Sequence, residues 1–585
     1  MRWMLLLAFA IAAIGCNGMG SSSPGGGGNP SPPSITSLNP VSGSVGASVT
    51  ITGSNFGATQ GTSTVKFNGI TATPASWSAT SIVAAVPTGA TTGNVVVTVG
   101  GVASNGVNFT VLNSVGTGPL RTLASNPHYF TDGSGKAILL SGSHTWNDVQ
   151  DTGNAGATTP IDYNAYVNFL KAHGQNATIL WHKDLPTFCS WGAGGTWRIA
   201  DSGFPWVRSS TPGASDGFNK WDLSTFNQAY FDRLRARTVQ LQQNGIYAIV
   251  EFFDGLGLLS NRCSNDGYPF TGGNNVNGVD DGGGTNSMTG TVPNAFTVIQ
   301  LAYIKKVIDT LNDLPNVVWE PSEEAPSGSA GWNTYMIAQI QAYEAGKPLQ
   351  HPILYATLTN DADTTLYDSN AMSIAPHARV SAANNCSGSG NPQCKVTIND
   401  SDHSYFGMWN DDAQTNRNYL WENFTNGSSV IFMDPYLIYA GSGNSNWTNR
   451  NPCDNNVQPA HGVCTIPDTR WDNFRDNMGY TLSYGNKMDL AKMTPQGSLS
   501  STGHCLAQTP ATGAEYLVYD ASGGGSFTVD LTAMPSSRTL NVEWLNPNTG
   551  SISPAGAVGA GATRTFTAPF GGDAVLYLVD AAGHN

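Results

Sequence analysis

Between residues 118 and 495, short apolar runs alternate with segments in which apolar residues recur at helical spacing. The runs predict buried strands at 137–142, 177–181, 246–253 and 316–319. The helical spacing predicts amphipathic helices at 161–173, 225–243 and 296–314. Strands that alternate with helices pair in parallel through helical crossovers. We expect a closed (β/α)8 TIM barrel; a doubly wound open sheet is the alternative, but no Gly-rich phosphate loop follows the first strand.

On both sides of this segment, the pattern changes to short runs of alternating apolar and polar residues, separated by turn residues. Residues 34–112 contain such runs at 49–53, 65–69 and 95–99. Residues 498–583 contain them at 515–519, 526–529, 540–544 and 574–578. We expect a β-sandwich in each region, and therefore a multidomain chain. Residues 17–33 are mostly Gly, Ser and Pro, which is typical of a flexible linker.

Residues 1–16 have the pattern of a bacterial signal peptide. Arg2 supplies a positive start, and residues 4–14 form an apolar run too short to span a bilayer. The run ends in Ala13-Ile14-Gly15-Cys16, which resembles the lipobox, in which the cysteine is lipidated; ordinary signal cleavage beside an incidental cysteine is the alternative. Lipidation of Cys16 would anchor an exported protein to a bacterial membrane, at the cell surface or in the periplasm.

Charged residues make up only 11% of the chain, and its formal net charge is −14. Nucleic acid is excluded as a partner, because its phosphates require a basic face and no basic stripe occurs. Export permits disulfides. Two pairs would close short loops and a third would join neighbouring barrel strands: Cys386–Cys394, Cys453–Cys464 and Cys189–Cys263. Cys505 is left over and is expected to be buried; no spacing indicates a metal site, and no cofactor is predicted.

The chemistry of a parallel barrel is located on the loops that follow the C-terminal ends of its strands. Candidate residues at these positions are His144, Trp146, Asn147, Trp181, His182, Lys183, Asp184, Glu251, Asp254, Glu320, Glu323, Glu324, His377, Asp400, Asp402, His403 and Asp434. Carboxylates dominate this set, and in a chain with so little charge they indicate a catalytic site. The residues among them that are expected to contact a sugar substrate are the tryptophans, the histidines, Asn147, Glu251, Glu323 and Asp434.

Some of these residues have simpler interpretations. The histidines could bind a metal, although we favour hydrogen bonds to substrate or to a catalytic carboxylate. Asp434 could cap a turn, and Glu320 could be a buried structural partner of Lys183. Asp280-Asp281 could bind calcium, but nothing else fits the ligand spacing, so we interpret this pair as part of a solvated loop.

Glycoside hydrolysis requires two carboxyl groups on separate strands, one protonated to donate to the leaving oxygen and one ionised to attack the sugar. We assign Glu324 as the acid/base, because it follows the fourth strand and because Glu320 and Glu323 would raise its proton affinity. The seventh strand ends at Asp400, which we assign as the nucleophile, with Asp402 as the second choice.

The segment Asn316-Val317-Val318-Trp319-Glu320-Pro321-Ser322-Glu323-Glu324 resembles the fourth-strand motif of clan A glycoside hydrolases, and the barrel resembles their apiosidase-like catalytic domains. The resemblance implies a retaining enzyme in which Glu324 is the acid/base. The chain departs from the clan at Glu323, where the clan has a sugar-binding Asn, and on the seventh strand, where it offers Asp instead of Glu. The stretches 142–146, 274–278 and 432–436 resemble exported bacterial proteins of this type, which adds Asn275 to the expected substrate contacts.

The flanking regions resemble two other families. Residues 35–40 and 53–57 resemble the IPT/TIG family of immunoglobulin-like sandwiches, usually spacers or binding modules. Residues 544–550 and 566–570 resemble the family described as the collagen-binding domain of a collagenase. No His-Glu-x-x-His motif occurs, so the metalloprotease constellation is absent from the sequence.

The predicted function is an exported retaining glycoside hydrolase that cleaves an extracellular polysaccharide. The departures at Glu323 and Asp400 motivate an alternative, a non-catalytic cell-surface protein that binds glycan or matrix through a degenerate barrel. A peptidase or collagen-binding adhesin is supported only by a family description.

Overall fold

The structure is a computed structural model that describes residues 31–582, apart from 45, 88–89, 91–92, 113–117, 146–147, 151, 155–156, 160, 189–196, 261, 357–370, 376–394, 402–412, 435 and 437–470. The chain divides into two compact units, residues 1–111 and 112–585, and each is described by itself. The predicted signal peptide, Cys16 and residues 17–30 of the predicted linker lie outside the described residues, so these features stay predictions. No helix in the described ranges combines the length and apolar character needed to cross a membrane.

The first unit is an antiparallel β-sandwich, as predicted. One sheet has the order β1 (Ser34–Asn39), β3 (Ser48–Ser54), β7 (Ser81–Ala85) and β6 (Pro74–Trp77). The other has the order β2 (Ser42–Ser44), β10 (Val107–Leu112), β8 (Gly93–Val99), β4 (Thr64–Phe67) and β5 (Ile70–Ala72), with β9 (Val102–Ala103) beside β8. Alternate residues of the two sheets, such as Ile51 and Val97, form one apolar core between them.

The second unit contains a closed parallel barrel. Its strands follow chain order: β13 (Ser141–His144), β16 (Ala177–Leu180), β21 (Tyr247–Glu251), β22 (Val317–Glu320), β23 (Leu354–Ala356), β24 (Ser373–Ala375), β25 (Val396–Ser401) and β26 (Ser429–Met433). The last strand pairs with the first, and a bridge between Trp319 and Ile353 joins the fourth to the fifth, which closes the barrel. The first strand begins at Ser141 rather than at 137, because Ile138 pairs antiparallel with Phe130 outside the barrel.

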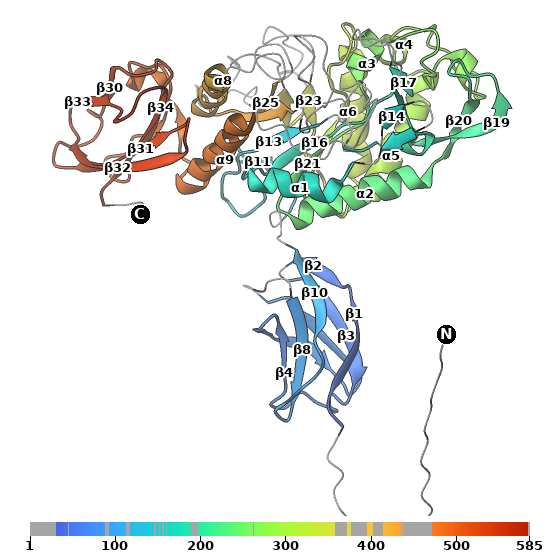
Figure 1. The fold of residues 1–585 in the computed structure, drawn as a ribbon, viewed down its shortest axis with the longest axis horizontal. Helices are drawn as coiled ribbons and strands as arrows, with labels where there is room; N and C mark the ends of the chain where they lie inside the picture. Colours follow the sequence, from blue (N-terminus) through green and yellow to red (C-terminus); the bar gives the residue numbers. More distant parts are fainter. Residues whose placement is uncertain are drawn as a thin grey trace, which may run out of the picture. The chain divides into compact units, whose positions relative to one another are not determined.

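Helices surround the barrel strands (Figure 1). They are α1 (Tyr163–Ala172), α2 (Gln228–Gln243), α5 (Ala295–Leu311), α6 (Ala330–Glu344), α8 (Ala413–Thr425) and α9 (Asp472–Lys487), with the short α3 (Gly255–Ser260) and α4 (Asn286–Thr289) after the third strand. The three predicted helices are confirmed; Asp162 caps α1, and Asn294 and Thr297 form a capping box at α5. Apolar residues fill both faces of the strands, which explains why the strands are continuous apolar runs.

Insertions lie between the early barrel strands and their helices. A small sheet contains β15 (Ala157–Thr159), β14 (Thr152–Asn154), β18 (Trp197–Ile199) and β17 (Thr187–Phe188). A hairpin of β19 (Trp206–Pro212) and β20 (Asn219–Phe226) precedes α2 and projects from the barrel (Figure 1).

The C-terminal region packs directly on the barrel. Its larger sheet has the order β27 (Thr494–Pro495), β28 (Cys505–Gln508), β29 (Glu515–Asp520), β34 (Ala574–Asp580), β31 (Thr539–Asn546) and β32 (Ser551–Gly559), and β30 (Ser526–Asp530) pairs with β33 (Thr563–Thr567). One face of the larger sheet lies against α8 and α9 and shares a core with them (Figure 1). In this core Trp421 stacks on Tyr519. Arg417 adds a buried ion pair with Asp573. This sheet is therefore an integral layer against the barrel.

The cysteine predictions are tested only in part. Cys505 is free and buried, as expected. Cys189, Cys386, Cys394, Cys453 and Cys464 lie outside the described residues, so the three expected pairings, including that of Cys263, stay predictions.

Candidate active site

The loop after the fourth strand buries three carboxyl groups. Glu320 ends β22, and Glu323 and Glu324 follow it; none of the three is more than 1% exposed. Glu324 has a φ of 42°, in the left-handed region that a residue with a side chain rarely adopts. Such strain persists only where the surroundings hold it, and it is concentrated at functional sites.

Gly255, after the third strand, holds this loop in place. Its N–H donates to the Glu323 carbonyl at 3.0 Å. A Cβ at Gly255 would lie 2.4 Å from the Glu324 carbonyl oxygen and 2.7 Å from the Ala325 Cα, so only glycine permits this approach. The third and fourth strand loops are therefore interlocked beside Glu324.

Asp400, near the end of β25, faces these glutamates from the seventh strand. Its charge raises the pKa values of Glu320, Glu323 and Glu324, and its side chain hydrogen-bonds that of Glu323. His144, on the first strand, places Nε2 3.6 Å from the Asp400 Oδ1. The structure thus brings the fourth and seventh strand carboxyl groups together, as the sequence predicted.

A carboxyl cluster occupies this end of the barrel. We define it as Glu251, Asp254, Glu320, Glu323, Glu324 and Asp400. Burial is the largest cause that raises the pKa of Glu324 to about 8, followed by the charges of Asp254 and Asp400, while Lys183 lowers it. Burial and Asp400 likewise raise the pKa of Glu320 to about 8, and burial raises that of Glu251 well above its usual value. Glu324 therefore holds a proton at neutral pH.

The first and second strands contribute an aromatic and a cationic group. Trp181 lies against His144, with ring centroids 5.0 Å apart, and both side chains are buried. The Lys183 ammonium lies 4.3 Å from the centroid of the Trp181 ring and 3.4 Å from Asp254 Oδ2. The sequence offered Glu320 as the structural partner of Lys183, but in the structure Lys183 pairs with Asp254. Glu320 instead interacts with Asp400 and Glu323.

The structure places His182 away from the carboxyl cluster. Its ring lies between the strands and the helices, with Nδ1 3.1 Å from the Tyr230 hydroxyl and Nε2 3.4 Å from Asp184. It also packs on Tyr303. These contacts orient Asp184, whose carboxylate accepts the Asp254 N–H at 2.8 Å.

Asn275 and Asp434 also make structural contacts. The Asn275 amide donates to carbonyls of its own loop, at Pro269 and Val279, and its oxygen accepts the Asn277 N–H. Asp434 forms a two-bond ion pair with Arg475 of α9 and accepts the Tyr436 N–H. Both therefore organise loops beside the barrel.

Five predicted site residues lie outside the described residues: Trp146, Asn147, His377, Asp402 and His403. Their roles stay predictions. Two residues that sequence reasoning missed are Gly255 and Gln150. For Gly255, the sequence signal was a glycine directly after Asp254, a candidate residue that follows the third strand. No local signal distinguishes Gln150.

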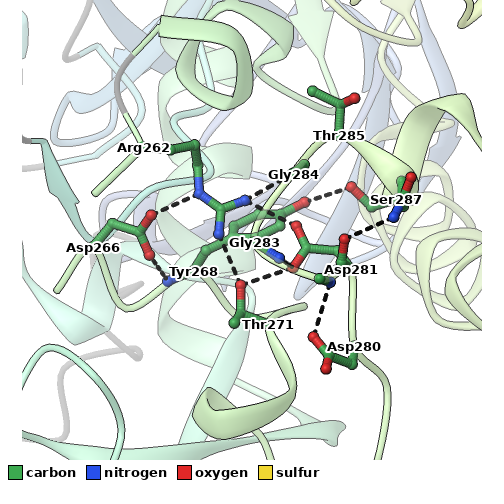
Figure 2. Close-up of polar contacts among 12 residues, drawn as sticks. Arg262, Asp266, Tyr268, Thr271, Asp280, Asp281, Gly283, Gly284, Thr285 and Ser287 are labelled. Atoms are coloured by element: carbon green, nitrogen blue, oxygen red, sulfur yellow. Dashed lines mark hydrogen bonds and ion pairs between the residues drawn. The ribbon is translucent and has the colours of Figure 1, made fainter. Parts of the chain in front are cut away.

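The expected solvated loop at Asp280-Asp281 is only half correct. Asp280 is exposed and accepts the Gly272 and Gly282 N–H groups. Asp281 is fully buried, and Figure 2 shows it sharing Arg262 with Asp266. The interpretation failed for Asp281 because the arginine that pairs with it, Arg262, lies 19 residues earlier in the sequence. No group of three or more potential metal ligands occurs among the residues that the structure describes.

Fold and site define a closed (β/α)8 barrel with buried carboxyl groups converging at the C-terminal ends of its strands. Comparison with known proteins adds matches for the two flanking regions. Residues 33–111 match the family model of the IPT/TIG domain. Residues 496–579 match the family model described as "Putative collagen-binding domain of a collagenase". No curated protein matches the chain in sequence.

Solved structures match most of the chain. A "putative glycoside hydrolase" from Bacteroides vulgatus is 14% identical with a TM-score of 0.55, and the match covers 92% of this chain and 99% of that one. A family 5 glycoside hydrolase from the same organism is 16% identical with a TM-score of 0.50, covering 80% of this chain and 93% of that one. At this level of identity the likeness shows the fold.

Proposed function

We propose that this protein is a retaining glycoside hydrolase that cleaves a glycosidic bond in an extracellular polysaccharide. The observation that supports this most strongly is the convergence of Glu324 and Asp400, from the fourth and seventh strands of one closed barrel, with Glu324 kept protonated by burial. Two carboxyl groups with different tasks are the minimum that this reaction needs.

In the proposed mechanism, Glu324 donates its proton to the leaving oxygen while Asp400 attacks the anomeric carbon and forms a glycosyl-enzyme bond. The ionised Glu324 then removes a proton from water, which attacks the same carbon and releases Asp400 as a carboxylate. His144, 3.6 Å from Asp400, orients the nucleophile. The resulting sugar keeps its anomeric configuration.

The subclass and the location belong to the same proposal. The fourth-strand motif that ends at Glu324 supports an apiosidase-like clan A enzyme, and glycoside hydrolases from Bacteroides vulgatus share the fold. The N-terminal pattern that ends at Cys16 supports export and a lipid anchor. The substrate is then a polysaccharide or oligosaccharide outside the cell.

The experiment is a screen of polysaccharides for released reducing sugar, followed by Glu324→Gln and Asp400→Asn on any glycan that is cleaved. Both variants should lose activity, and Asp280→Asn, on an exposed turn, should keep it. Proton NMR of the first product should show retained configuration. Full activity in both site variants would overturn the assignment, and calorimetric glycan binding without any product would favour the degenerate barrel.

A further inference from the structure

Lys183 carries a buried ammonium group that lies among carboxyl groups. Its side chain is 5% exposed. The Gln150 amide bonds both sides of the Lys183 backbone: its oxygen accepts the Lys183 N–H at 2.7 Å, and its nitrogen donates to the Lys183 carbonyl at 3.0 Å. Gln150 is itself fully buried. These bonds hold the Lys183 backbone in place, and its ammonium lies between the Trp181 ring and Asp254.

The partner of Lys183 is fixed equally well. Asp254 Oδ2 lies 3.4 Å from the ammonium, and Oδ1 accepts the Gly257 N–H at 3.0 Å. The Asp254 N–H donates to Asp184, and the Asp254 backbone forms a parallel bridge with Glu323. The ion pair therefore stands directly against the loop that positions Glu324.

Several charged or titratable groups face Glu324. Asp254 comes from the third strand, Asp400 from the seventh, Lys183 from the second, and Glu323 from the same loop. A buried carboxyl group among like charges resists ionisation, but the acid/base of a retaining enzyme must ionise in every cycle. A nearby cation reduces this conflict.

We propose that Lys183 is a positioning residue for the acid/base: by neutralising Asp254 it lets Glu324 alternate between donating and accepting a proton during one turnover. This inference rests on the proposed function. It is consistent with the opposite effects of the two partners, since Asp254 raises the pKa of Glu324 and Lys183 lowers it.

The first test compares pH profiles of kcat/KM for wild type, Lys183→Met and Lys183→Arg on a cleaved glycan. Loss of the cation should raise the pKa of Glu324, so the alkaline limb of the Lys183→Met profile should move upward by about one pH unit, a tenfold change in the proton affinity of Glu324. The arginine variant should restore the wild-type limb. Lys492→Met, at an exposed ion pair with Asp489, is the matched control and should leave the profile unchanged.

The second test needs no substrate. The melting temperature is followed from pH 5 to pH 9 for wild type, Lys183→Met, Glu324→Gln and the double variant. Because a carboxyl group with a raised folded pKa loses its stabilising proton as pH rises, Lys183→Met should fall more steeply than wild type, and the excess should shrink in the Glu324→Gln background. If Lys183→Met does not fold, Asp254→Asn replaces it and should move both readouts in the opposite direction.

Unchanged pH profiles and unchanged melting curves in Lys183→Met would overturn the inference. If no glycan is cleaved but the effect of Lys183→Met on the melting curve shrinks in the Glu324→Gln background, the electrostatic role of Lys183 holds and the proposed function fails. If a glycan is cleaved but Lys183→Met has the same effect on the melting curve with and without Glu324→Gln, the proposed function stands and the inference about Lys183 fails.

Discussion

Two sets of buried carboxyl groups lie beside the same barrel, and their key members differ in how many hydrogen-bond partners they have. In the arginine network (Arg262, Asp266, Thr271 and Asp281), Asp281 accepts from the Arg262 guanidinium at 2.8 Å, from the Thr271 hydroxyl at 2.9 Å and from the Gly283 N–H at 3.0 Å (Figure 2). In the carboxyl cluster, neither oxygen of Glu251 or Glu324 has a hydrogen-bond partner among the described residues.

The difference separates structure from function. A buried carboxylate with a cation and several donors keeps its charge and fixes the loop around it. A buried carboxyl group without such partners costs stability and retains a proton instead. Natural proteins keep such costly groups chiefly at functional sites. The contrast therefore supports catalysis at the carboxyl cluster and a structural role for the arginine network.

The largest expected effect is on activity. Glu324→Gln should lower kcat by about 10²–10⁴-fold, the usual contribution of a general acid/base, because an amide is too weak an acid to protonate the leaving oxygen. Its stability should be unchanged or higher, since no hydrogen bond to Glu324 is lost among the described residues. Activity on a cleaved glycan and the melting temperature are measured together; a lower melting temperature with residual activity would place Glu324 in a structural role.

The second effect is on stability. Arg262→Met leaves Asp266 and Asp281 buried without their cation, which should cost about 3–5 kcal/mol of unfolding free energy. Arg235→Met removes an ion pair with the mostly exposed Asp313 and should cost at most about 1 kcal/mol. Urea unfolding followed by tryptophan fluorescence compares the two variants. Equal costs would mean that the arginine network does not stabilise its loop.

The comparison also shows what the sequence could predict. The carboxyl cluster was found because parallel strands all end at one side of a barrel, so the residues after each strand converge whatever their separation along the chain. Glu324 and Asp400 follow this rule, and so do Glu251 and Lys183. The barrel itself follows from the alternation of apolar strands and amphipathic helices.

Contacts that depend on loop conformation could not be predicted. Asp281 is paired by an arginine from a separate turn, and Asn275 bonds carbonyls of its own loop; both depend on a path that no periodicity encodes. His182 shows a different limit. It follows the second strand like Trp181 and Lys183, yet its side chain points toward the helices, because alternate residues at a strand end face opposite sides.

A third prediction tests whether geometry matters as much as charge in the carboxyl cluster. Gly255→Ala adds a Cβ that would lie 2.4 Å from the Glu324 carbonyl oxygen, so the loop must shift. A displacement of about 1 Å at a catalytic group can cost about 100-fold in rate, and kcat should fall by that order. Gly273→Ala, where a Cβ meets nothing within 4 Å, is the control. Wild-type kcat in Gly255→Ala would show that the strained loop is not required.

The smallest expected effect is on the pH dependence of stability, and its sign distinguishes partnered from unpartnered carboxyl groups. The folded pKa of Glu324, about 8, exceeds its usual value of 4.5, so its contribution to stability is complete below about pH 4.5 and is lost as pH rises toward 8. Glu324→Gln should therefore lose less melting temperature than wild type between pH 5 and pH 9, by about 1 °C for each kcal/mol involved in a unit of this size. Asp280→Asn is the control of opposite sign: backbone hydrogen bonds lower the pKa of Asp280, so its contribution is lost only in acid, and removing it should leave the curve above pH 5 unchanged. Parallel curves for wild type and Glu324→Gln would mean that Glu324 is ionised in the folded protein, and its assignment as proton donor would fail.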